Sequence, residues 1–187
     1  MIVMLSGRAG EGKTTFANYC RDELQLKGSI SKVFSFAQAV KDTAKLMNWD
    51  GKKDDRGRTL LQKVGAAGRE YDINTWANIA VEKIQDWIST WTIDSDIWVA
   101  LIDDWRFENE GNVLMETFYP VLKARIIRPK EFHLLLNTPL YNDISEIGLP
   151  EFDEKYYDVG IYNSTDLKGL KNTARQFINK LLTGENK

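Results

Sequence analysis

The sequence contains a single cysteine, Cys20, so a disulfide within the chain is excluded. It also lacks a surplus of basic residues, because 25 Lys and Arg stand against 27 Asp and Glu, for a formal net charge of -2. Broad binding of nucleic acid requires a strongly basic face, so we expect no nucleic-acid polymer as a partner. No apolar stretch is long enough to cross a bilayer, and the first residues lack the basic and apolar regions of a signal peptide. We therefore expect no membrane partner and a cytoplasmic location.

Hydrophobic residues make up 43% of the 187 residues, which is enough for one sizeable core. No internal repeat or low-complexity linker divides the sequence. We therefore expect a single domain over residues 1–187, and the sequence leaves open whether two copies form a homodimer.

Short apolar runs alternate with segments of helical period, which is typical of a parallel sheet with helices on both faces. The third run is apolar throughout, as a central buried strand should be. The expected fold class is therefore α/β, with a last helix over 167–182. The runs expected to form strands are 1–5, 32–36, 97–102, 122–127 and 157–161.

The first apolar run leads into the segment Gly7-Arg8-Ala9-Gly10-Glu11-Gly12-Lys13-Thr14, called the phosphate loop below. It matches the pattern G-x-x-x-x-G-K-[ST] at every fixed position. Its glycines let successive backbone N–H groups converge on a β-phosphate, and the helix that follows directs its positive end at the same anions. The motif predicts a nucleoside-triphosphate site. The residues expected to bind this nucleotide are Gly7, Gly10, Gly12, Lys13, Thr14 and Thr15.

Two side chains of the phosphate loop have expected roles in the chemistry. Lys13 would bridge the β- and γ-phosphates, and we expect it to be exposed, so that its truncation leaves the fold intact. The Thr14 hydroxyl is placed to ligate a Mg²⁺ carried by the nucleotide, since Mg²⁺ prefers oxygen ligands and keeps much of its water.

Two irregular regions flank this site in the sequence. The insertion between the second and third strands is too long for a plain crossover, and its part at about 48–75 is expected to cover a second substrate. Its end should be an amphipathic helix with Trp76, Ala80, Ile84, Trp87, Ile88 and Trp91 on one face. The stretch at about 129–155 carries three prolines and few helix signals, and we expect it to form a lid.

The reaction is indicated by the segment that ends the third strand, Asp103-Asp104-Trp105-Arg106-Phe107-Glu108-Asn109-Glu110. Ligands of an open α/β sheet sit beyond the carboxyl ends of its strands, so this segment should face the γ-phosphate. A carboxylate there can hold Mg²⁺ through water or orient the attacking oxygen. An adjacent guanidinium can grip a phosphate with two hydrogen bonds.

With these features the chain resembles the deoxynucleoside monophosphate kinase family, best known from bacteriophages, within the P-loop kinases. The likeness spans nearly the whole chain. Besides the phosphate loop, it rests on Asp104-x-Arg106-Phe107-x-Asn109-Glu110, on Ser35-Phe36-Ala37 followed by Lys41, on Ser145-Glu146, and on Tyr157-Asp158-Val159-Gly160-Ile161-Tyr162-Asn163. The resemblance implies a five-stranded parallel sheet in the order 2-3-1-4-5. It also implies transfer of the γ-phosphoryl of ATP, with Mg²⁺, to the 5′-phosphate of a deoxynucleoside monophosphate.

The resemblance further implies roles for single residues. Three basic residues would bind the acceptor phosphate or sugar: Lys41, Arg69 and Arg106. Asp104 would sit between the acceptor and Mg²⁺, ligating the metal partly through water. Asn163 with Ser164 would line the adenine pocket.

One feature departs from the pattern of nucleoside monophosphate kinases, whose lids commonly contribute arginines to the transferring phosphoryl group. The expected lid contains no arginine. We expect Arg128 to take this role rather than Arg125, because Arg128 ends the fourth strand at the carboxyl edge where the chemistry lies. The only histidine, His133, is interpreted as a surface residue of the lid, since transfer to an ionised phosphate needs no strong general base.

Other classes are weighed against this interpretation. A GTPase-type switch is disfavoured because the guanine-reading pattern N-K-x-D is missing, and Asn179-Lys180 continues into Leu181-Leu182. Two alternatives stay open: a P-loop kinase of a non-nucleotide acceptor, resembling phosphomevalonate or dephospho-coenzyme A kinase, and a non-catalytic nucleotide-binding protein. Trp49, Tyr71 or Trp76 could stack on an acceptor base or belong to the core.

Overall fold

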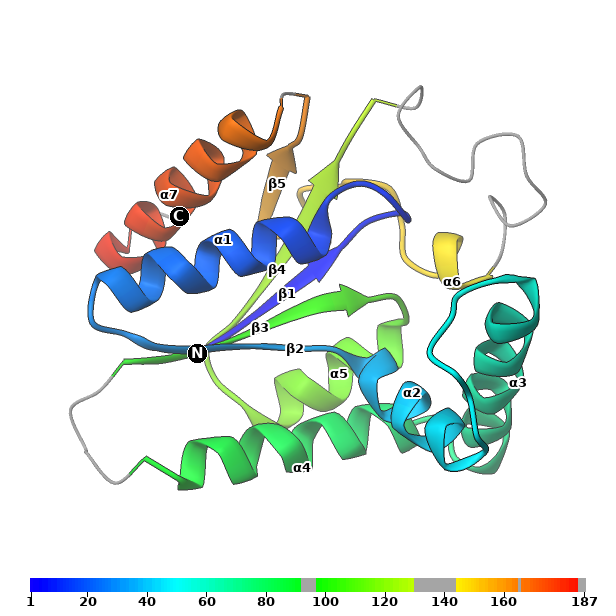
Figure 1. The fold of residues 1–187 in the computed structure, drawn as a ribbon. Coiled ribbons are helices and arrows are strands. Elements are labelled where there is room, and N and C mark those ends of the chain that lie inside the picture. The colour runs from blue at the N-terminus through cyan, green and yellow to red at the C-terminus, as the bar shows by residue number, and fades with distance from the viewer. Residues whose placement is uncertain (92–96, 130–143, 165, 185–187) are drawn as a thin grey trace.

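A computed structural model of the chain describes residues 1–91, 97–129, 144–164 and 166–184, and Figure 1 shows its ribbon. One parallel sheet contains β1 (Ile2–Ser6), β2 (Ile30–Phe34), β3 (Trp98–Trp105), β4 (Val121–Ile127) and β5 (Val159–Tyr162). Their order is β2-β3-β1-β4-β5. The structure thus confirms the predicted α/β class, the strand order and the five predicted strands, with shifts of a few residues at their ends.

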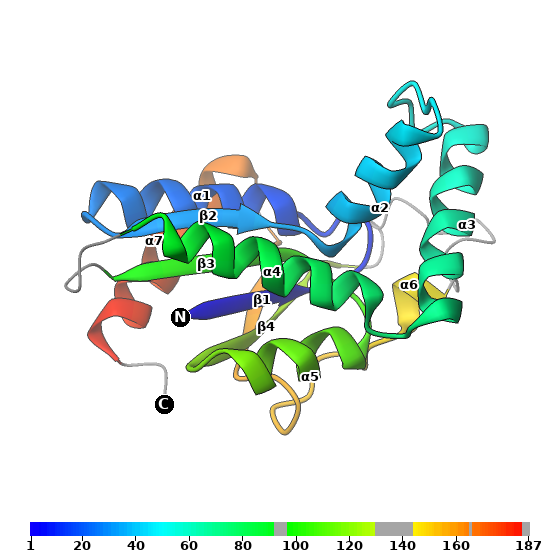
Figure 2. The same cartoon turned by 90° about the horizontal axis from the view of Figure 1, so that it is seen from below.

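The helices cover both faces of the sheet. α1 (Lys13–Leu26) and α7 (Leu167–Thr183) lie on one face, above the sheet in Figure 1. α4 (Thr75–Ser89) and α5 (Glu108–Thr117) lie on the other face, which is turned toward the viewer in Figure 2. None of the helices in the described part of the chain combines the length and the apolar character that a membrane span needs.

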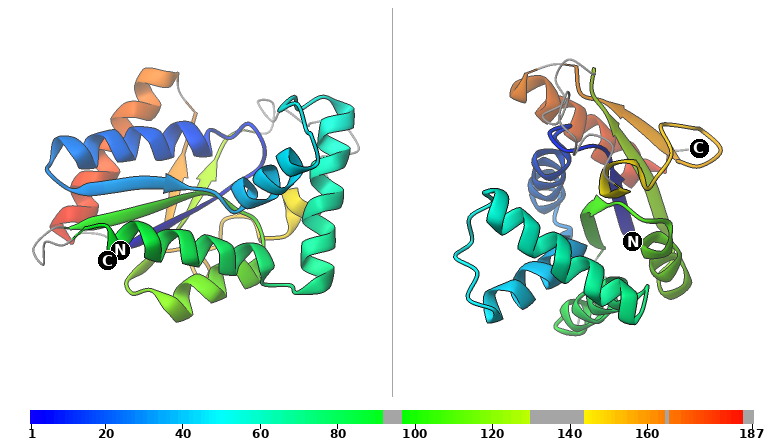
Figure 3. Two further views of the ribbon diagram at one scale, coloured as in Figure 1. Left: turned by 60° about the horizontal axis from the view of Figure 1, so that its bottom comes forward. Right: turned by 90° about the vertical axis from the view of Figure 1, so that its right-hand side faces the viewer.

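A second group of helices lies at the carboxyl ends of the strands. α2 (Phe36–Leu46) and α3 (Asp55–Tyr71) form a hairpin that projects beyond β2 and β3, as the left view of Figure 3 shows. The short helix α6 (Ile144–Ile147) lies beside this hairpin. The predicted insertion is therefore largely helical, and it stands next to the sheet edge at which ligands of such folds bind.

The alternation of side chains along β1 supplies two cores. Val3 and Leu5 pack against α1 and α7, whereas Ile2 and Met4 pack against α4 and α5. All four are fully buried. A strand covered on both faces buries all of its side chains, which explains why this run of the sequence is apolar throughout.

A third apolar cluster joins the projecting helices to α4. Its centre is Trp76, which is 6% exposed and donates its indole N–H to the carbonyl of Gly65 at 2.9 Å. Gly68 lies under the same ring, since a Cβ built there would come within 2.4 Å of it. The glycines of α3 thus let the helix approach Trp76 closely. This burial supports the core interpretation of Trp76, while Tyr71 is 92% exposed and Trp91 is 50% exposed.

Candidate active site

The phosphate loop connects β1 to α1 at the carboxyl edge of the sheet. Gly12 precedes α1 in the left-handed region, with φ of 95°, and a Cβ there would lie 2.7 Å from the side-chain amide of Asn163. Gly7 has φ of 150°, and a Cβ there would lie 2.5 Å from a carboxylate oxygen of Glu11. Both positions therefore require glycine, and together they fold the loop tightly around the start of α1.

Asn163 supports the phosphate loop through a hydrogen bond to the loop backbone. Its side-chain Nδ2 donates to the backbone carbonyl of Glu11 at 2.8 Å, and the residue is 5% exposed. The amide that the resemblance assigns to the adenine pocket is thus bonded to the loop. Ser164, its neighbour, lines a cavity of about 370 Å³ beside the loop, together with Ile127, Arg128 and Tyr162.

Lys13 is enclosed by its own loop. Its Nζ donates to the carbonyl oxygens of Gly7 at 2.7 Å and Arg8 at 2.8 Å. The residue is 7% exposed, so the expectation of an exposed lysine was wrong, because the loop wraps around the side chain. Burial lowers the pKa of Lys13 to about 8, with a further lowering by Arg106 and an opposing effect of Glu146.

Thr14 faces Asp103, the first of two consecutive acids near the end of β3. Its hydroxyl donates to Asp103 Oδ2 at 2.6 Å. The other carboxylate oxygen, Oδ1, is buried and has no hydrogen-bond partner among the described residues. Burial, with the nearby Asp104, raises the pKa of Asp103, while the Thr14 hydroxyl and Lys41 oppose the shift. An oxygen pair of this kind, with one buried oxygen left over, fits a hard cation such as Mg²⁺.

Asp104 has a different set of contacts. Its carboxylate accepts hydrogen bonds from the Ser35 hydroxyl at 2.5 Å and from the backbone N–H groups of Phe36 at 2.8 Å and Ala37 at 2.9 Å. It therefore caps the start of α2 from outside the helix. Sequence reasoning placed Asp104 beside the metal, but the structure puts Asp103 against Thr14 and commits both oxygens of Asp104 to α2. The sequence block at Ser35–Ala37 is explained by this cap.

The expected lid is described only in part, because residues 130–143 lie outside the described residues. Arg128, at the end of β4, donates from Nη1 to the carbonyl of Gly10 in the phosphate loop at 2.9 Å. Arg125 lies further back and is 4% exposed, with its Nη1 bonded to the Ser6 hydroxyl at 3.0 Å. Both arginines line the cavity beside the phosphate loop, and the choice of Arg128 for the transferring phosphoryl group stays a prediction.

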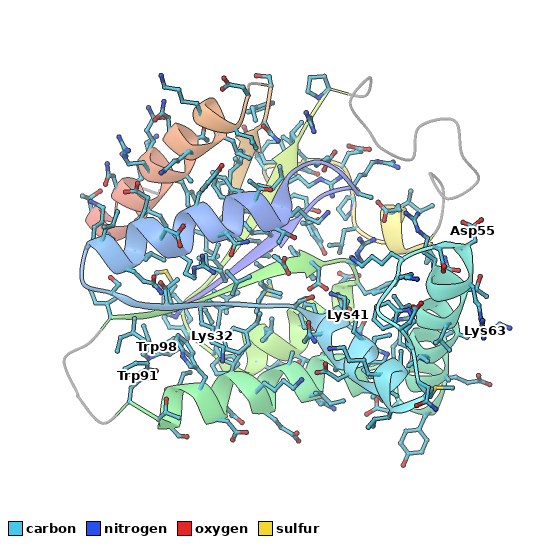
Figure 4. All side chains as sticks on the ribbon, viewed as in Figure 1. Lys32, Lys41, Asp55, Lys63, Trp91 and Trp98 are labelled. Carbon is cyan, nitrogen blue, oxygen red and sulfur yellow. The ribbon has the colours of Figure 1, made fainter. Side chains whose placement is uncertain are left out.

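The basic residues expected at the acceptor come from three elements at the same edge of the sheet. Lys41, labelled in Figure 4, lies on α2, close enough to Asp103 to oppose the rise in the pKa of that acid. Arg69, near the end of α3, lies with its guanidinium carbon 4.8 Å from the ring centre of Phe107. Arg106 precedes that ring directly. We call Lys41, Arg69 and Arg106 the acceptor cations. Lys63, also on α3, is exposed and projects from the far side of the helix.

Arg106 is held at both its backbone and its guanidinium. Its backbone N–H donates to Glu110 Oε2 at 3.0 Å, and its Nη1 donates to Glu146 Oε1 at 2.5 Å. The second oxygen of Glu146 accepts the backbone N–H of Ala9 at 2.6 Å. A single carboxylate from α6 thus touches both the phosphate loop and Arg106. In the sequence analysis, Glu146 appears only in the segment Ser145-Glu146 that supports the family resemblance, and no role is predicted for it.

Comparisons with known proteins bear on the fold. No family model matches the chain. The uncharacterized protein ORF77 of Ictalurid herpesvirus 1 (strain Auburn) is 26% identical over 147 residues, a match that covers 79% of this chain and 58% of that protein. The chain therefore spans little more than half the length of this curated relative.

Among solved structures, the Mycobacterium tuberculosis APS kinase CysC, in complex with AMPPNP and APS, is 14% identical with a TM-score of 0.50. The structure of APE1195 is 17% identical, also with a TM-score of 0.50. In both cases the likeness covers 97% of this chain and 96% of the other. The chain has the fold of a P-loop kinase.

The residues of the candidate site fall into two groups. The phosphate loop, Arg128 and the cavity beside them lie at β1, β4 and β5, whereas the acceptor cations come from α2, α3 and the end of β3. Thr14 and Asp103 stand between the two groups. Among the described residues, no group of three or more His, Cys, Asp or Glu side chains is placed to hold a metal ion.

Proposed function

We propose that the protein is a kinase that transfers the γ-phosphoryl group of ATP to the 5′-phosphate of a deoxynucleoside monophosphate. The observation that carries this proposal is the bridge at Glu146, whose carboxylate contacts the phosphate loop through Ala9 and the acceptor cations through Arg106. One small anion spans the two groups. A phosphoryl group bound to the loop is therefore within reach of an acceptor phosphate held by Arg106.

The chemistry follows from the charges in the site. An oxygen of the acceptor phosphate forms a bond to the γ-phosphorus, the bond from that phosphorus to the β,γ-bridging oxygen breaks, and ADP leaves. The main obstacle is repulsion between two phosphates brought into line, which positively charged groups on several sides offset. The phosphate loop, Lys13, Arg128 and the acceptor cations supply such groups. An ionised phosphate is its own nucleophile, so the site needs no general base.

Two parts of the structure fit the Mg²⁺ ion and the adenosine half of ATP. Thr14 Oγ1 and the buried Oδ1 of Asp103 would hold Mg²⁺ directly or through water. When bound, Mg²⁺ supplies charge neutralisation between the β- and γ-phosphates. The cavity beside the loop, lined by Arg128, Tyr162 and Ser164, is of a size suited to the adenosine half of ATP.

A screen of acceptors tests the proposal. The protein is incubated with ATP, Mg²⁺ and, one at a time, each deoxynucleoside and ribonucleoside monophosphate, phosphomevalonate and dephospho-coenzyme A, and formation of ADP is measured. We expect turnover with one or more deoxynucleoside monophosphates. Turnover only with a non-nucleotide acceptor would replace the proposed substrate class, and tight ATP binding without turnover on any acceptor would indicate a non-catalytic nucleotide-binding protein.

A matched pair of variants controls for contaminating kinases. Lys13→Met removes the ammonium group from the phosphate loop and should abolish the activity. Lys27→Met removes the same charge from an exposed position after α1, outside the site, and should leave the activity near that of the wild type.

A further inference from the structure

Glu146 stands in the middle of the site although nothing in the proposed reaction uses a carboxylate there. The residue is carried by α6, far from the phosphate loop in sequence, and its side chain is only 6% exposed. One oxygen accepts from the Arg106 guanidinium at 2.5 Å and the other from the Ala9 backbone N–H at 2.6 Å. The carboxylate is buried, and its two oxygens accept hydrogen bonds from donors on two different segments. The contact is therefore a specific feature of the fold.

The two donors are of the kind that bind a phosphoryl group. A guanidinium and a loop amide both bind phosphate oxygens well, and a carboxylate offers them two oxygens in a similar arrangement. The carboxylate and a phosphoryl group therefore compete for the same donors. They also repel each other, since both are anions that would lie at the same donors.

We propose that Glu146 is a built-in competitor of the substrate phosphates, which takes the place of the transferred phosphoryl group and must be displaced before that group can bind. Displacement breaks the contacts of Glu146 with Arg106 and with Ala9 in one step, so that both donors can bind phosphate oxygens, and it removes this link between α6 and the phosphate loop. The inference rests on the proposed function only where it names the displacing group as the transferred phosphoryl group. The competition itself holds for any polyphosphate that enters the loop.

Calorimetric titration of the full chain with sodium tripolyphosphate, and separately with ATP and Mg²⁺, tests the competition. Glu146→Gln keeps the size of the side chain and an oxygen that can accept the Ala9 N–H, but removes the negative charge. We expect this variant to bind both ligands about tenfold more tightly than the wild type, because its pairing with Arg106 is weaker and the repulsion is gone. Adenosine, which has no phosphate, should bind the two proteins equally well.

The matched control is Glu154→Gln, which removes one negative charge from an exposed position in the same part of the chain. It should change the affinity for tripolyphosphate by less than about twofold, because exposed charges are screened. If Glu146→Gln is not folded by circular dichroism, Glu146→Asp serves instead. Its shorter side chain cannot reach both Arg106 and Ala9, so it should also tighten binding, by a few-fold.

Unchanged or weaker binding of tripolyphosphate by the folded Glu146 variant would overturn the inference and make Glu146 a structural link between α6 and the loop. This outcome differs from failure of the proposed function. The function fails when no monophosphate acceptor is phosphorylated, whatever the ratio of the tripolyphosphate affinities.

Discussion

At the scale of single residues, two neighbouring acids of β3 have separate duties. Relative to β1, β3 contains one extra residue near its end, since Met4 pairs with Ile102 but Ser6 pairs with Trp105. The side chain of Asp103 follows the in-and-out alternation of β3 and points to the side of the sheet on which α1 and Thr14 lie. Asp104 faces α2 and caps it. Because successive side chains of a strand point to opposite sides, the two consecutive carboxylates meet different partners, Thr14 and the start of α2.

This division predicts opposite effects of two matched substitutions. Asp103→Asn should lower kcat about a hundredfold or more and raise the Mg²⁺ concentration needed for half-maximal rate, because the metal-side charge is lost. Asp104→Asn should lower the free energy of unfolding by about 1–2 kcal/mol, because an amide cannot accept at both of its terminal atoms. Steady-state rates across a Mg²⁺ series and denaturant unfolding of both variants measure this, and the reverse pattern would restore Asp104 as the metal-side acid.

The buried position of Lys13 predicts a pH dependence of ATP binding. Since burial lowers the pKa of Lys13 to about 8, the fraction of charged lysine falls as the pH rises through that value. The charged form attracts phosphate, so ATP affinity should weaken between pH 7.5 and 9.5, a range placed around that pKa. Titrations at several pH values should show this slope in the wild type and a flat profile in Lys13→Met. A wild-type profile as flat as that of the variant would contradict the account.

Arg106 predicts a difference between the two substrates. Arg106→Ala removes a charge-assisted pair worth about 1.5–3 kcal/mol, so kcat/KM for the acceptor should fall ten- to more than a hundredfold. The KM for ATP should change much less. Arg106→Lys should restore only part of the loss, because an ammonium group lacks the planar pair of donors. Kinetics with each substrate varied in turn provide the measurement, with Lys63→Ala on the outer side of α3 as the control.

If Arg106 only pairs with surface acids, Arg106→Ala will leave both substrate constants near those of the wild type. In the structure the guanidinium pairs with Glu146, whose side chain is buried, which is not the surface contact that this alternative requires.

At the scale of elements, the strands were predictable and the helix α3 was not. The strands form continuous apolar runs because both faces of the sheet are covered, and such runs are visible in any sequence. α3 contains Gly57, Gly65 and Gly68, which lower helix propensity by about 1 kcal/mol each relative to alanine. Contacts that form only in the folded chain compensate for them. The Asp54 side chain accepts the Gly57 N–H at 2.8 Å, and Trp76 packs on Gly68.

The packing of α3 on α4 predicts that two glycines of one helix respond differently to alanine. Gly68→Ala should destabilise the protein by about 1–3 kcal/mol, because a Cβ there would lie 2.4 Å from the Trp76 ring. Gly65→Ala is the control. Its Cβ would come no closer than 3.4 Å, to the mobile end of Arg69, so the gain in helix propensity should keep the stability level or raise it. Thermal unfolding of both variants tests this, and equal destabilisation would refute the role given to Gly68.

At the scale of the whole molecule, the site is assembled from segments that are distant in the chain. The phosphate loop was recognisable because it matches a local pattern of residue types. The bonds of Glu146 to Ala9 and Arg106 join positions 137 and 40 residues apart, and no local pattern records them. The same holds for Asn163, which braces the loop across 152 residues. A local sequence pattern can therefore propose the groups of the candidate site, but it does not predict which of them touch.

Transfer of label from ATP tests the central claim most directly. With ATP labelled in the γ-phosphoryl group, Mg²⁺ and a deoxynucleoside monophosphate, the account predicts that the label appears in the β-phosphate of the deoxynucleoside diphosphate, in equal amount to the ADP formed. Lys13→Met should form neither product. Label released only as inorganic phosphate, or no transfer to any of the deoxynucleoside monophosphates by folded protein that binds ATP, would contradict it.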